Sequence, residues 1–234
     1  MICKHNLSYF KELNIKFGMN KIKSTTPEEI EEIKSILLRE YPNSVTELKY
    51  KNLYQLLISV ILSAQCTDKR VNVITPPLFK KYPTVVDLAN ANLDDVKELI
   101  KSCSYFNNKA KNLIKMAQQV IDNFNSKIPL NQKDLMSLAG VGQKTANVVM
   151  IEYLREDIMA VDTHVFRVSH RLGLSSAKSA TKTEEELTKK FKTNLHQLHQ
   201  AMVLFGRYRC RAINPKCDDC FLAHLCKSKD RFKV

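Results

Sequence analysis

The stretch Asp134-Leu-Met-Ser-Leu-Ala-Gly-Val-Gly-Gln-Lys-Thr-Ala-Asn147 predicts two short helices joined by a tight turn at Gly140-Val141-Gly142. Two glycines two positions apart let the backbone turn sharply and approach a ligand closely. The start of the second helix directs free backbone N–H groups and the positive end of its dipole outward, where a phosphate oxygen can bind. The pattern is typical of a helix-hairpin-helix, which would contact the DNA backbone through Gly140, Val141 and Gly142. The alternative is an ordinary connection between two helices that contains two glycines.

The sequence on both sides of this stretch is also helical in pattern, so the predicted fold class is all-α. Thr26-Pro27-Glu28-Glu29 supplies a capping hydroxyl, a proline at the first helical position and an acid three residues after the cap, which predicts a helix that ends near Tyr41-Pro42. Residues 50–64 are apolar on nearly every side, as in a helix at the centre of a domain. Further helices are predicted at 70–82, 84–90, 93–103, 108–123, 133–138, 144–154, 163–172, 183–190 and 195–207.

The composition and charge of the chain indicate a folded protein with a polyanionic partner. Of its 234 residues, 44% are hydrophobic and 26% are charged, as in ordinary globular proteins, and the formal net charge is +13. Residues 189–234 contain eleven Lys or Arg and three Asp, so they contribute +8 of this charge. An uneven positive excess suits nucleic acid, and a merely basic soluble protein is the alternative. The longest apolar stretch, 53–64, is too short to span a bilayer.

Lys144 and Asp162 are the candidate catalytic residues. Lys144 follows the predicted turn, and Asp162 lies in Ala160-Val-Asp-Thr-His-Val-Phe-Arg-Val168, just before another predicted helix. A lysine attacks only when its amine has lost its proton, and a helix start disfavours the ammonium form. A buried carboxylate close to that amine would hold it and stabilise the positive charge that develops when a sugar–base bond breaks. The simpler interpretations are a phosphate contact for Lys144, an N-cap for Asp162 and a surface position for His164.

Four of the seven cysteines form the pattern Cys210-x6-Cys217-x2-Cys220-x5-Cys226. The start of the chain has no export signal, so clustered cysteines are more typical of metal ligands than of disulfides. The spacing matches neither a ferredoxin nor a zinc finger, and it predicts a four-cysteine site for either Zn²⁺ or a [4Fe–4S] cluster. Arg211 and Lys216 lie inside the loop, where they could face a phosphate backbone.

The first 25 residues are predicted to form a flexible basic extension. Residues 1–24 contain five Lys and one Glu with little periodicity, and Met19 is an alternative start. An organelle-targeting peptide is the alternative role, with weak support because the segment has no Arg and few Ser. We therefore expect a cytoplasmic protein that associates with the nucleoid.

Four stretches together resemble the endonuclease III family. They are Leu62-Ser-Ala-Gln-Cys-Thr-Asp68, Gly140-Val-Gly-Gln-Lys-Thr-Ala-Asn-Val-Val149, Val161-Asp-Thr-His-Val-Phe-Arg-Val168 and the cysteine pattern, and the resemblance runs from about Pro27 to Cys226. It implies two all-α domains with DNA between them. One is a six-helix barrel at 46–156 that includes the helix-hairpin-helix (134–147), and the other is an iron–sulfur domain formed by 26–45 and 157–234.

The resemblance also implies an activity and roles for individual residues. Lys144 matches the attacking lysine of the family, Asp162 its catalytic aspartate, and Gln65 the residue that enters the gap left by a flipped nucleotide. Tyr105 falls where the family often has a Leu that faces the opposite strand. The implied metal group is a [4Fe–4S] cluster. The implied activity is that of a monomeric, bifunctional DNA N-glycosylase and abasic-site lyase acting on duplex DNA with a damaged base or an abasic site.

Some features depart from the family pattern and leave other functions open. Ala139 replaces the usual Pro before the first hairpin glycine, which is expected to loosen the turn, and Ser104 and Tyr105 replace a common Gly and Leu. The rival functions are a non-catalytic DNA-binding module, in which Lys144 only contacts phosphate, and a monofunctional glycosylase that releases a base without a nick. The adenine-excising branch of the family lacks the lysine and usually carries an extra C-terminal domain. This chain has Lys144 and ends eight residues after Cys226, so oxidised pyrimidines are the expected substrates.

Overall fold

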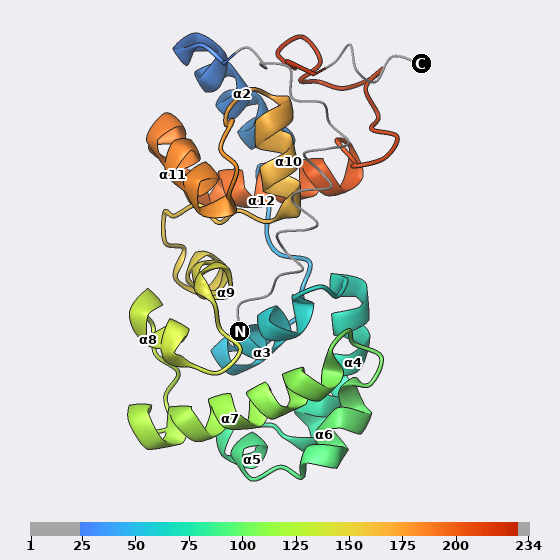
Figure 1. The fold of residues 1–234 in the computed structure, drawn as a ribbon, viewed down its shortest axis with the longest axis vertical. Helices are drawn as coiled ribbons and strands as arrows, with labels where there is room; N and C mark the ends of the chain where they lie inside the picture. Colours follow the sequence, from blue (N-terminus) through green and yellow to red (C-terminus); the bar gives the residue numbers. More distant parts are fainter. Residues whose placement is uncertain (1–23, 229–234) are drawn as a thin grey trace.

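The computed structural model describes residues 24–228, and within this range every regular element is a helix (Figure 1). The elements are α2 (Pro27–Glu40), α3 (Leu53–Ser63), α4 (Asp68–Lys81), α5 (Val85–Ala89), α6 (Leu93–Ile100), α7 (Phe106–Phe124), α8 (Gln132–Ser137), α9 (Gln143–Val149), the π-helical turn η1 (Met150–Leu154), α10 (Thr163–Arg171), α11 (Ala180–Phe191) and α12 (Leu195–Tyr208). The predicted all-α fold is confirmed, and the ends of the expected helices shift by only a few residues. Residues 1–23, which hold nearly all of the predicted extension, lie outside the described residues.

Helix α2 begins where the capping pattern predicts. The Thr26 hydroxyl accepts a hydrogen bond from the Glu29 N–H (3.3 Å), and the Glu29 carboxylate accepts one from the Thr26 N–H (2.9 Å). Just before the helix, Thr25 is buried and its hydroxyl donates to the Leu172 carbonyl oxygen at 2.6 Å. The expectation that the flexible extension includes residue 25 is therefore wrong at that residue, because this bond fixes Thr25 against the end of α10.

Helix α3 runs through the interior of the protein, as its apolar sequence predicts. Asn52 caps its start by accepting a hydrogen bond from the Gln55 N–H at 3.0 Å. Its buried residues are Tyr54, Leu56, Leu57, Ile58, Ser59, Val60, Ile61 and Leu62. Burial on almost every side explains why this sequence has no polar stripe.

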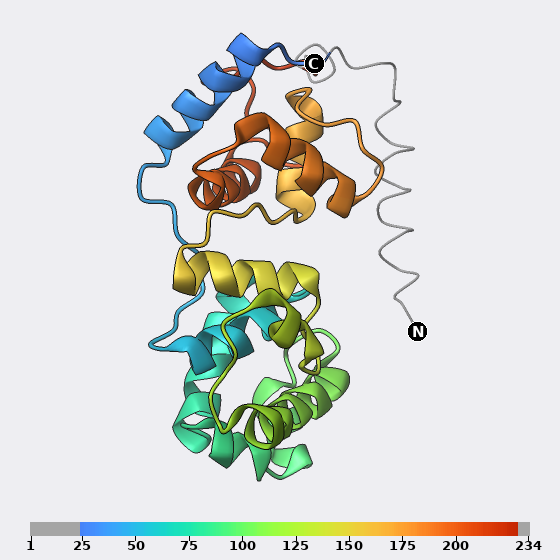
Figure 2. The ribbon, with the colours of Figure 1, turned by 90° about the vertical axis from the view of Figure 1, so that its left-hand side faces the viewer.

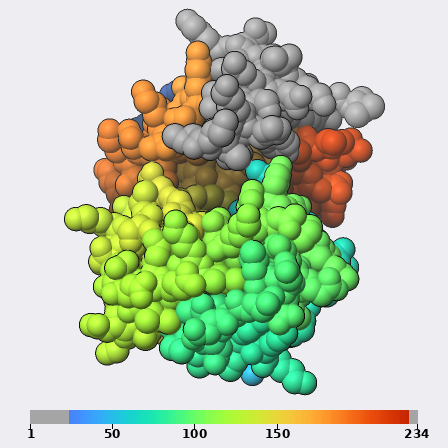
Figure 3. All heavy atoms as spheres, turned by 60° about the horizontal axis from the view of Figure 1, so that its bottom comes forward, coloured from blue at the N-terminus to red at the C-terminus, as the bar shows by residue number. Residues whose placement is uncertain are grey.

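The buried apolar residues form two separate cores, one in each lobe of the molecule (Figure 2). The first lobe contains α3 to α9, and its core residues lie between Leu48 and Val149. The core of the second lobe combines α2 with residues between Met159 and Leu225. The space-filling view looks onto the first lobe, with the orange and red segments of the second lobe beyond it (Figure 3). These cores support the domain division at 26–45, 46–156 and 157–234, which stays a prediction.

Helix α9 lies at the junction of the lobes and continues directly as η1 (Figure 2). The sequence predicts one α-helix at 144–154, so the wider π-helical turn is a difference, and such turns are frequent at functional sites. Glu152 in this turn is 3% exposed, and its carboxylate accepts hydrogen bonds from the Thr46 N–H (3.2 Å) and from the Gln200 side chain of α12. The end of the helix is thereby anchored to the second lobe.

None of the helices within residues 24–228 combines the length and the apolar character that crossing a membrane requires.

Candidate active site

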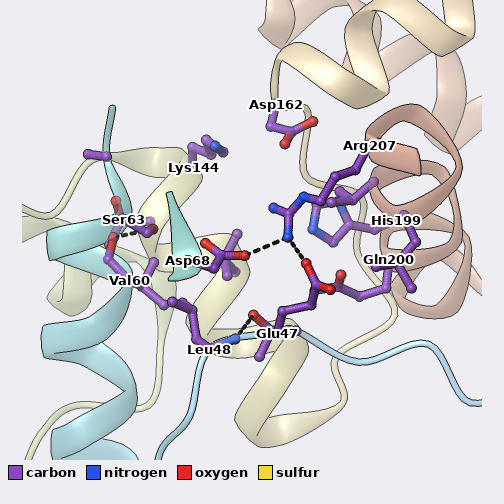
Figure 4. A pocket seen from close by; sticks show the side chains of 16 residues that line it. Glu47, Leu48, Val60, Ser63, Asp68, Lys144, Asp162, His199, Gln200 and Arg207 are labelled. Atoms are coloured by element: carbon purple, nitrogen blue, oxygen red, sulfur yellow. Dashed lines mark hydrogen bonds and ion pairs between the residues drawn. The ribbon is translucent and has the colours of Figure 1, made fainter. Parts of the chain in front are cut away.

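A hollow of about 110 Å³ lies between the lobes, and both predicted catalytic residues line it (Figure 4). Lys144 reaches it from α9, and Asp162 reaches it from the start of α10 on the opposite side. The structure therefore brings together two residues that are eighteen positions apart in the sequence and belong to different lobes. None of the other predicted site residues lines this hollow. They lie in the hairpin turn, on loops of the first lobe and in the loop after α12.

Lys144 lies in the first turn of α9, as the hairpin sequence predicts. Gly142 caps this helix without a side-chain hydrogen bond, so no side chain of the cap competes for the N–H groups of the first turn. The Lys144 side chain is exposed rather than buried. Its amine is therefore accessible to a substrate that enters between the lobes.

Asp162 both caps α10 and faces the hollow. Its Oδ1 accepts a hydrogen bond from the Val165 N–H at 2.8 Å, so the simpler interpretation as an N-cap is correct. The carboxylate also lies across the hollow from Lys144 (Figure 4). Burial alone would raise the pKa of Asp162, but the positive charge of Lys144, a contribution from His164 and the Val165 N–H hold that pKa below its ordinary value. The carboxylate is therefore ionised at neutral pH, as a group that stabilises positive charge must be.

Two histidines lie near Asp162. His199 is buried on α12 and lines the hollow, with its Nδ1 2.8 Å from the Ala160 carbonyl oxygen. His164 is half-buried, with its Nδ1 3.2 Å from Arg167 Nη2, so the expectation of a surface histidine is wrong. Burial lowers the pKa of His164 and of His199, which makes both imidazoles neutral at pH 7. His199 could not be predicted from the sequence, because no local motif marks it.

Arg207 joins the two lobes at the edge of the hollow. Its guanidinium lies 2.8 Å from Asp68 at the start of α4, and it also pairs with Glu47 in the segment before α3 (Figure 4). The Tyr208 hydroxyl donates a hydrogen bond to the same Glu47. Arg207 is 139 positions from Asp68 and 160 from Glu47. This group could not be predicted from the sequence either, because contacts over such separations leave no local pattern.

The hairpin glycines have different roles. Gly140 has a φ of +81°, and an added Cβ would lie 3.2 Å from the Asn112 Cβ, so the turn requires glycine there. A Cβ on Gly142 would meet nothing within 4 Å, which leaves this side of the backbone open to a ligand. Val141 is buried and its N–H donates to the Leu138 carbonyl oxygen at 3.1 Å. The Val141 N–H is therefore already paired within the turn, and the contact of Val141 with DNA stays a prediction.

Ala139 makes a hydrogen bond that the proline usual at this position could not make. Its N–H donates to Gln119 Oε1 on α7 at 2.7 Å, and proline has no N–H. This hydrogen bond ties the hairpin to α7, and the expected loosening of the turn stays a prediction.

Gln65 and Tyr105, the two residues expected to fill the DNA gap, lie on exposed loops of the first lobe. Both have left-handed backbone conformations, with φ of 54° for Gln65 and 59° for Tyr105. Tyr105 is 60% exposed. Non-glycine residues adopt this conformation uncommonly, and such backbone strain occurs often at functional sites.

The four cysteines of the pattern lie in the loop after α12, and each is half-buried. Burial raises the pKa of the Cys217, Cys220 and Cys226 thiols, and Cys210 acts on each of them in the same direction. Arg171 Nη1 donates to the Cys210 sulfur at 3.3 Å, and Arg211 and Lys216 are exposed on the loop. Within residues 24–228, no three His, Cys, Asp or Glu side chains form a site for a single metal ion. Four thiols with a cationic neighbour are the donor set that an iron–sulfur cluster uses.

The chain matches two family models. Residues 58–193 match the model described as HhH-GPD superfamily base excision DNA repair protein, and residues 210–226 match the iron–sulfur binding domain of endonuclease III. The helical fold and these matches define the class of this protein. It is an enzyme of base excision DNA repair, a DNA glycosylase.

Comparison with individual relatives narrows the class. Endonuclease III of Haemophilus influenzae is 41% identical over 204 residues, which cover 86% of this chain and 95% of the relative. Endonuclease III of Bacillus subtilis is 40% identical over 189 residues, which cover 80% and 86%. A solved structure of a trapped endonuclease III–DNA covalent intermediate matches with a TM-score of 0.85 at 40% identity, covering 89% of this chain and 99% of that one. The chain belongs to the endonuclease III family, and it carries the iron–sulfur cluster of that family.

Proposed function

We propose that this protein is a bifunctional DNA N-glycosylase and abasic-site lyase that removes oxidised pyrimidines from duplex DNA and nicks the strand 3′ to the lesion. The observation that carries this proposal is the position of Lys144 and Asp162 on opposite sides of one hollow between the lobes. An amine and an ionised carboxylate so placed match the two roles that the reaction requires. The amine is the nucleophile, and the carboxylate stabilises the positive charge that develops on the sugar.

DNA binding precedes the chemistry. The open backbone at Gly142 and the start of α9 would hold a phosphate, and the exposed Arg211 and Lys216 would contact the backbone from the cysteine loop. Turning a damaged nucleotide out of the stack costs a few kcal/mol. Gln65 and Tyr105 would fill the gap that it leaves. The iron–sulfur cluster would be held by Cys210, Cys217, Cys220 and Cys226, and it would fix the loop that presents these cations.

Lys144 then performs the bond-breaking steps. Its Nζ gives up a proton to solvent and attacks C1′ of the deoxyribose. The C1′–N bond to the damaged base breaks with its electron pair leaving on the base, which takes up a proton from solvent. Asp162 stabilises the positive charge that develops on the sugar. One proton of the attached amine moves to O4′ as the C1′–O4′ bond breaks and the sugar ring opens, which gives a protonated Schiff base between Nζ and C1′. Removal of a proton from C2′ then expels the 3′ phosphate by β-elimination.

Several features favour this reaction over its rivals. A monofunctional glycosylase needs no attacking amine, and a DNA-binding module needs no carboxylate opposite it. The trapped covalent intermediate of a 40% identical endonuclease III with DNA supports a covalent route. We further propose that the protein acts as a monomer in the cytoplasm, at the nucleoid. Any role of the N-terminal extension in targeting concerns residues outside those described.

Reductive trapping tests the proposal. Wild-type protein should nick an abasic-site duplex and cross-link to it when borohydride reduces the Schiff base. Lys144→Gln should keep duplex binding but lose both reactions, since its amide cannot attack C1′. Lys80→Gln, which removes an equal charge from an exposed site on α4, is the control and should behave as wild type. Cross-linking by Lys144→Gln would refute the assignment, and base release without a nick by wild type would identify a monofunctional enzyme.

A further inference from the structure

Lys109, near the start of α7, is a buried lysine that no part of the proposed reaction uses. Its side chain is almost entirely covered, with 7% of the residue exposed. Its Nζ donates to the carbonyl oxygens of Leu62 (2.8 Å) and Ala64 (2.6 Å) and to the sulfur of Cys103 (3.2 Å). Among the described residues no carboxylate forms an ion pair with it. Burying a lysine amine is costly unless its hydrogen bonds are made, and the three contacts of Lys109 offset this cost. The position of these contacts in the fold indicates what the buried lysine does.

The partners of Lys109 lie at the end of one helix and just before another. Leu62 is in the last turn of α3 and Ala64 is its C-cap, where carbonyl groups lack helical partners and carry the negative end of the helix dipole. Cys103 belongs to the turn that follows α6. The ammonium group of Lys109 therefore connects two loops that are about forty residues apart in sequence.

These two loops carry the residues expected to enter the DNA. Gln65 directly follows Ala64, and Tyr105 lies two positions after Cys103. The Lys109 N–H also donates to the Tyr105 carbonyl oxygen at 3.1 Å. Both Gln65 and Tyr105 have a positive φ, so each depends on its surroundings to stay in an uncommon conformation. Lys109 thus holds the backbone on which both side chains stand, together with the Cys103 thiol, which donates directly to the Leu62 carbonyl oxygen at 3.4 Å.

We propose that Lys109 is a positioning residue that fixes Gln65 and Tyr105 relative to each other, so that both enter the gap left by the flipped nucleotide. This inference rests on the proposed function, in which these two side chains fill that gap. Lys109 itself touches no substrate, and its effect passes through the backbone of the two loops. Its loss should therefore impair insertion into DNA without removing the attacking amine.

The test uses a duplex that carries a tetrahydrofuran abasic analogue opposite 2-aminopurine, whose fluorescence rises when the base is unstacked. Wild type should raise the fluorescence on binding, and Lys109→Met should not, although both should bind an undamaged duplex equally well. Nicking at saturating DNA should fall by about 100-fold in Lys109→Met, the size of effect that small misplacements cause. If Lys109→Met does not fold, Lys109→Gln, whose shorter amide cannot reach both loops, serves instead.

Lys34→Met is the matched control for a merely structural role. Lys34 also bonds a carbonyl at a helix end, that of Phe191 in α11 (3.0 Å), together with the Thr193 hydroxyl (2.8 Å), but it lies in the second lobe. This variant should lose thermal stability and keep the fluorescence response. If Lys109→Met also loses only stability, the inference is wrong.

A double-mutant cycle with Gln65→Ala provides the second readout. If Lys109 acts through Gln65, the double variant should lose little more nicking activity than either single variant. Independent losses that multiply would overturn the inference. Failure of the proposed function is distinguishable, because wild type would then show no borohydride cross-link while the fluorescence comparison would still report insertion.

Discussion

Arg207 of α12 and Asp68 of α4 form an ion pair, 2.8 Å between nitrogen and oxygen, that crosses the junction of the two lobes. The Asp68 side chain is 16% exposed, so it depends on Arg207 for a partner. The pair lies at the rim of the hollow that contains Lys144 and Asp162. The same ion pair therefore both stabilises the fold and holds together the two lobes that carry Lys144 and Asp162.

Arg207→Met should lower the free energy of unfolding by about 1–3 kcal/mol, since it leaves a largely buried carboxylate without its partner. Urea denaturation at pH 7 measures this loss. Arg39→Met is the control, because Arg39 pairs with Glu40 on the surface and its loss should change stability by less than about 0.5 kcal/mol. Equal losses in the two variants would show that the contact across the junction contributes nothing.

Asp162→Asn should separate the capping role of this residue from its role in chemistry. Asparagine caps a helix about as well as aspartate, so stability at pH 7 should change by less than about 1 kcal/mol. The rate of base release should fall by at least about 100-fold, because the negative charge is lost. Asp162→Ala should lose the same activity and a further ~1 kcal/mol of stability. An active Asp162→Asn enzyme would leave Asp162 as a helix cap only.

The acid stability of the protein should also depend on Asp162. Its pKa in the folded protein lies below the ordinary value, which the unfolded chain retains. The ionised group therefore stabilises the fold above the unfolded-state pKa, and this contribution is lost as the pH falls through the folded-state pKa. Between pH 5 and pH 2, approximately, wild type should lose more stability than Asp162→Asn in thermal melts. Parallel curves would contradict the assigned direction of the shift.

Gly142→Ala should reduce DNA affinity while leaving the fold intact. An added Cβ meets no protein atom within 4 Å, and the φ of −96° suits alanine. The melting temperature should therefore stay unchanged, while a methyl group between backbone and phosphate should weaken duplex binding at fixed salt. Gly140→Ala should instead destabilise the protein by about 1–2 kcal/mol, because its φ is positive. If Gly142→Ala bound duplex DNA as tightly as wild type, the phosphate could not lie against the Gly142 backbone.

The purified protein should be yellow-brown, with broad visible absorption from iron–sulfur charge transfer. Cys217→Ser should bleach this absorption and reduce iron content, whereas Cys66→Ser, in the other lobe, should leave both unchanged. Iron analysis and visible spectra measure the outcome. A colourless protein with one zinc per chain would contradict the cluster.

The sequence predicts the elements of this fold well because each depends on nearby residues. The capping box at Thr26 and Glu29, the uniformly apolar α3 and the glycines of the hairpin are local patterns, and the structure contains each of them. The placement of Lys144 in the first helical turn and of Asp162 as an N-cap followed for the same reason.

The contacts that complete the site could not be predicted in this way. Arg207 meets Glu47 and Asp68, and Lys109 meets the end of α3, only after the chain has folded back on itself. The burial of Val141 and the Ala139–Gln119 hydrogen bond likewise depend on how the hairpin packs against the rest of the first lobe. Such packing is a property of the whole fold and leaves no signature in a single stretch of sequence.

The uninterrupted run from α9 into η1 has a mechanical consequence. Its first turn carries Lys144 and its last turn is anchored by Glu152 to α12, so one continuous segment links the amine to the second lobe. Asp162 belongs to the lobe on the other side. A small rocking of one lobe against the other would therefore bring the amine and the carboxylate together or move them apart. In the proposed reaction, a duplex that bends readily at a lesion would favour the closed arrangement, so that the stiffness of the DNA itself would help decide which sites react.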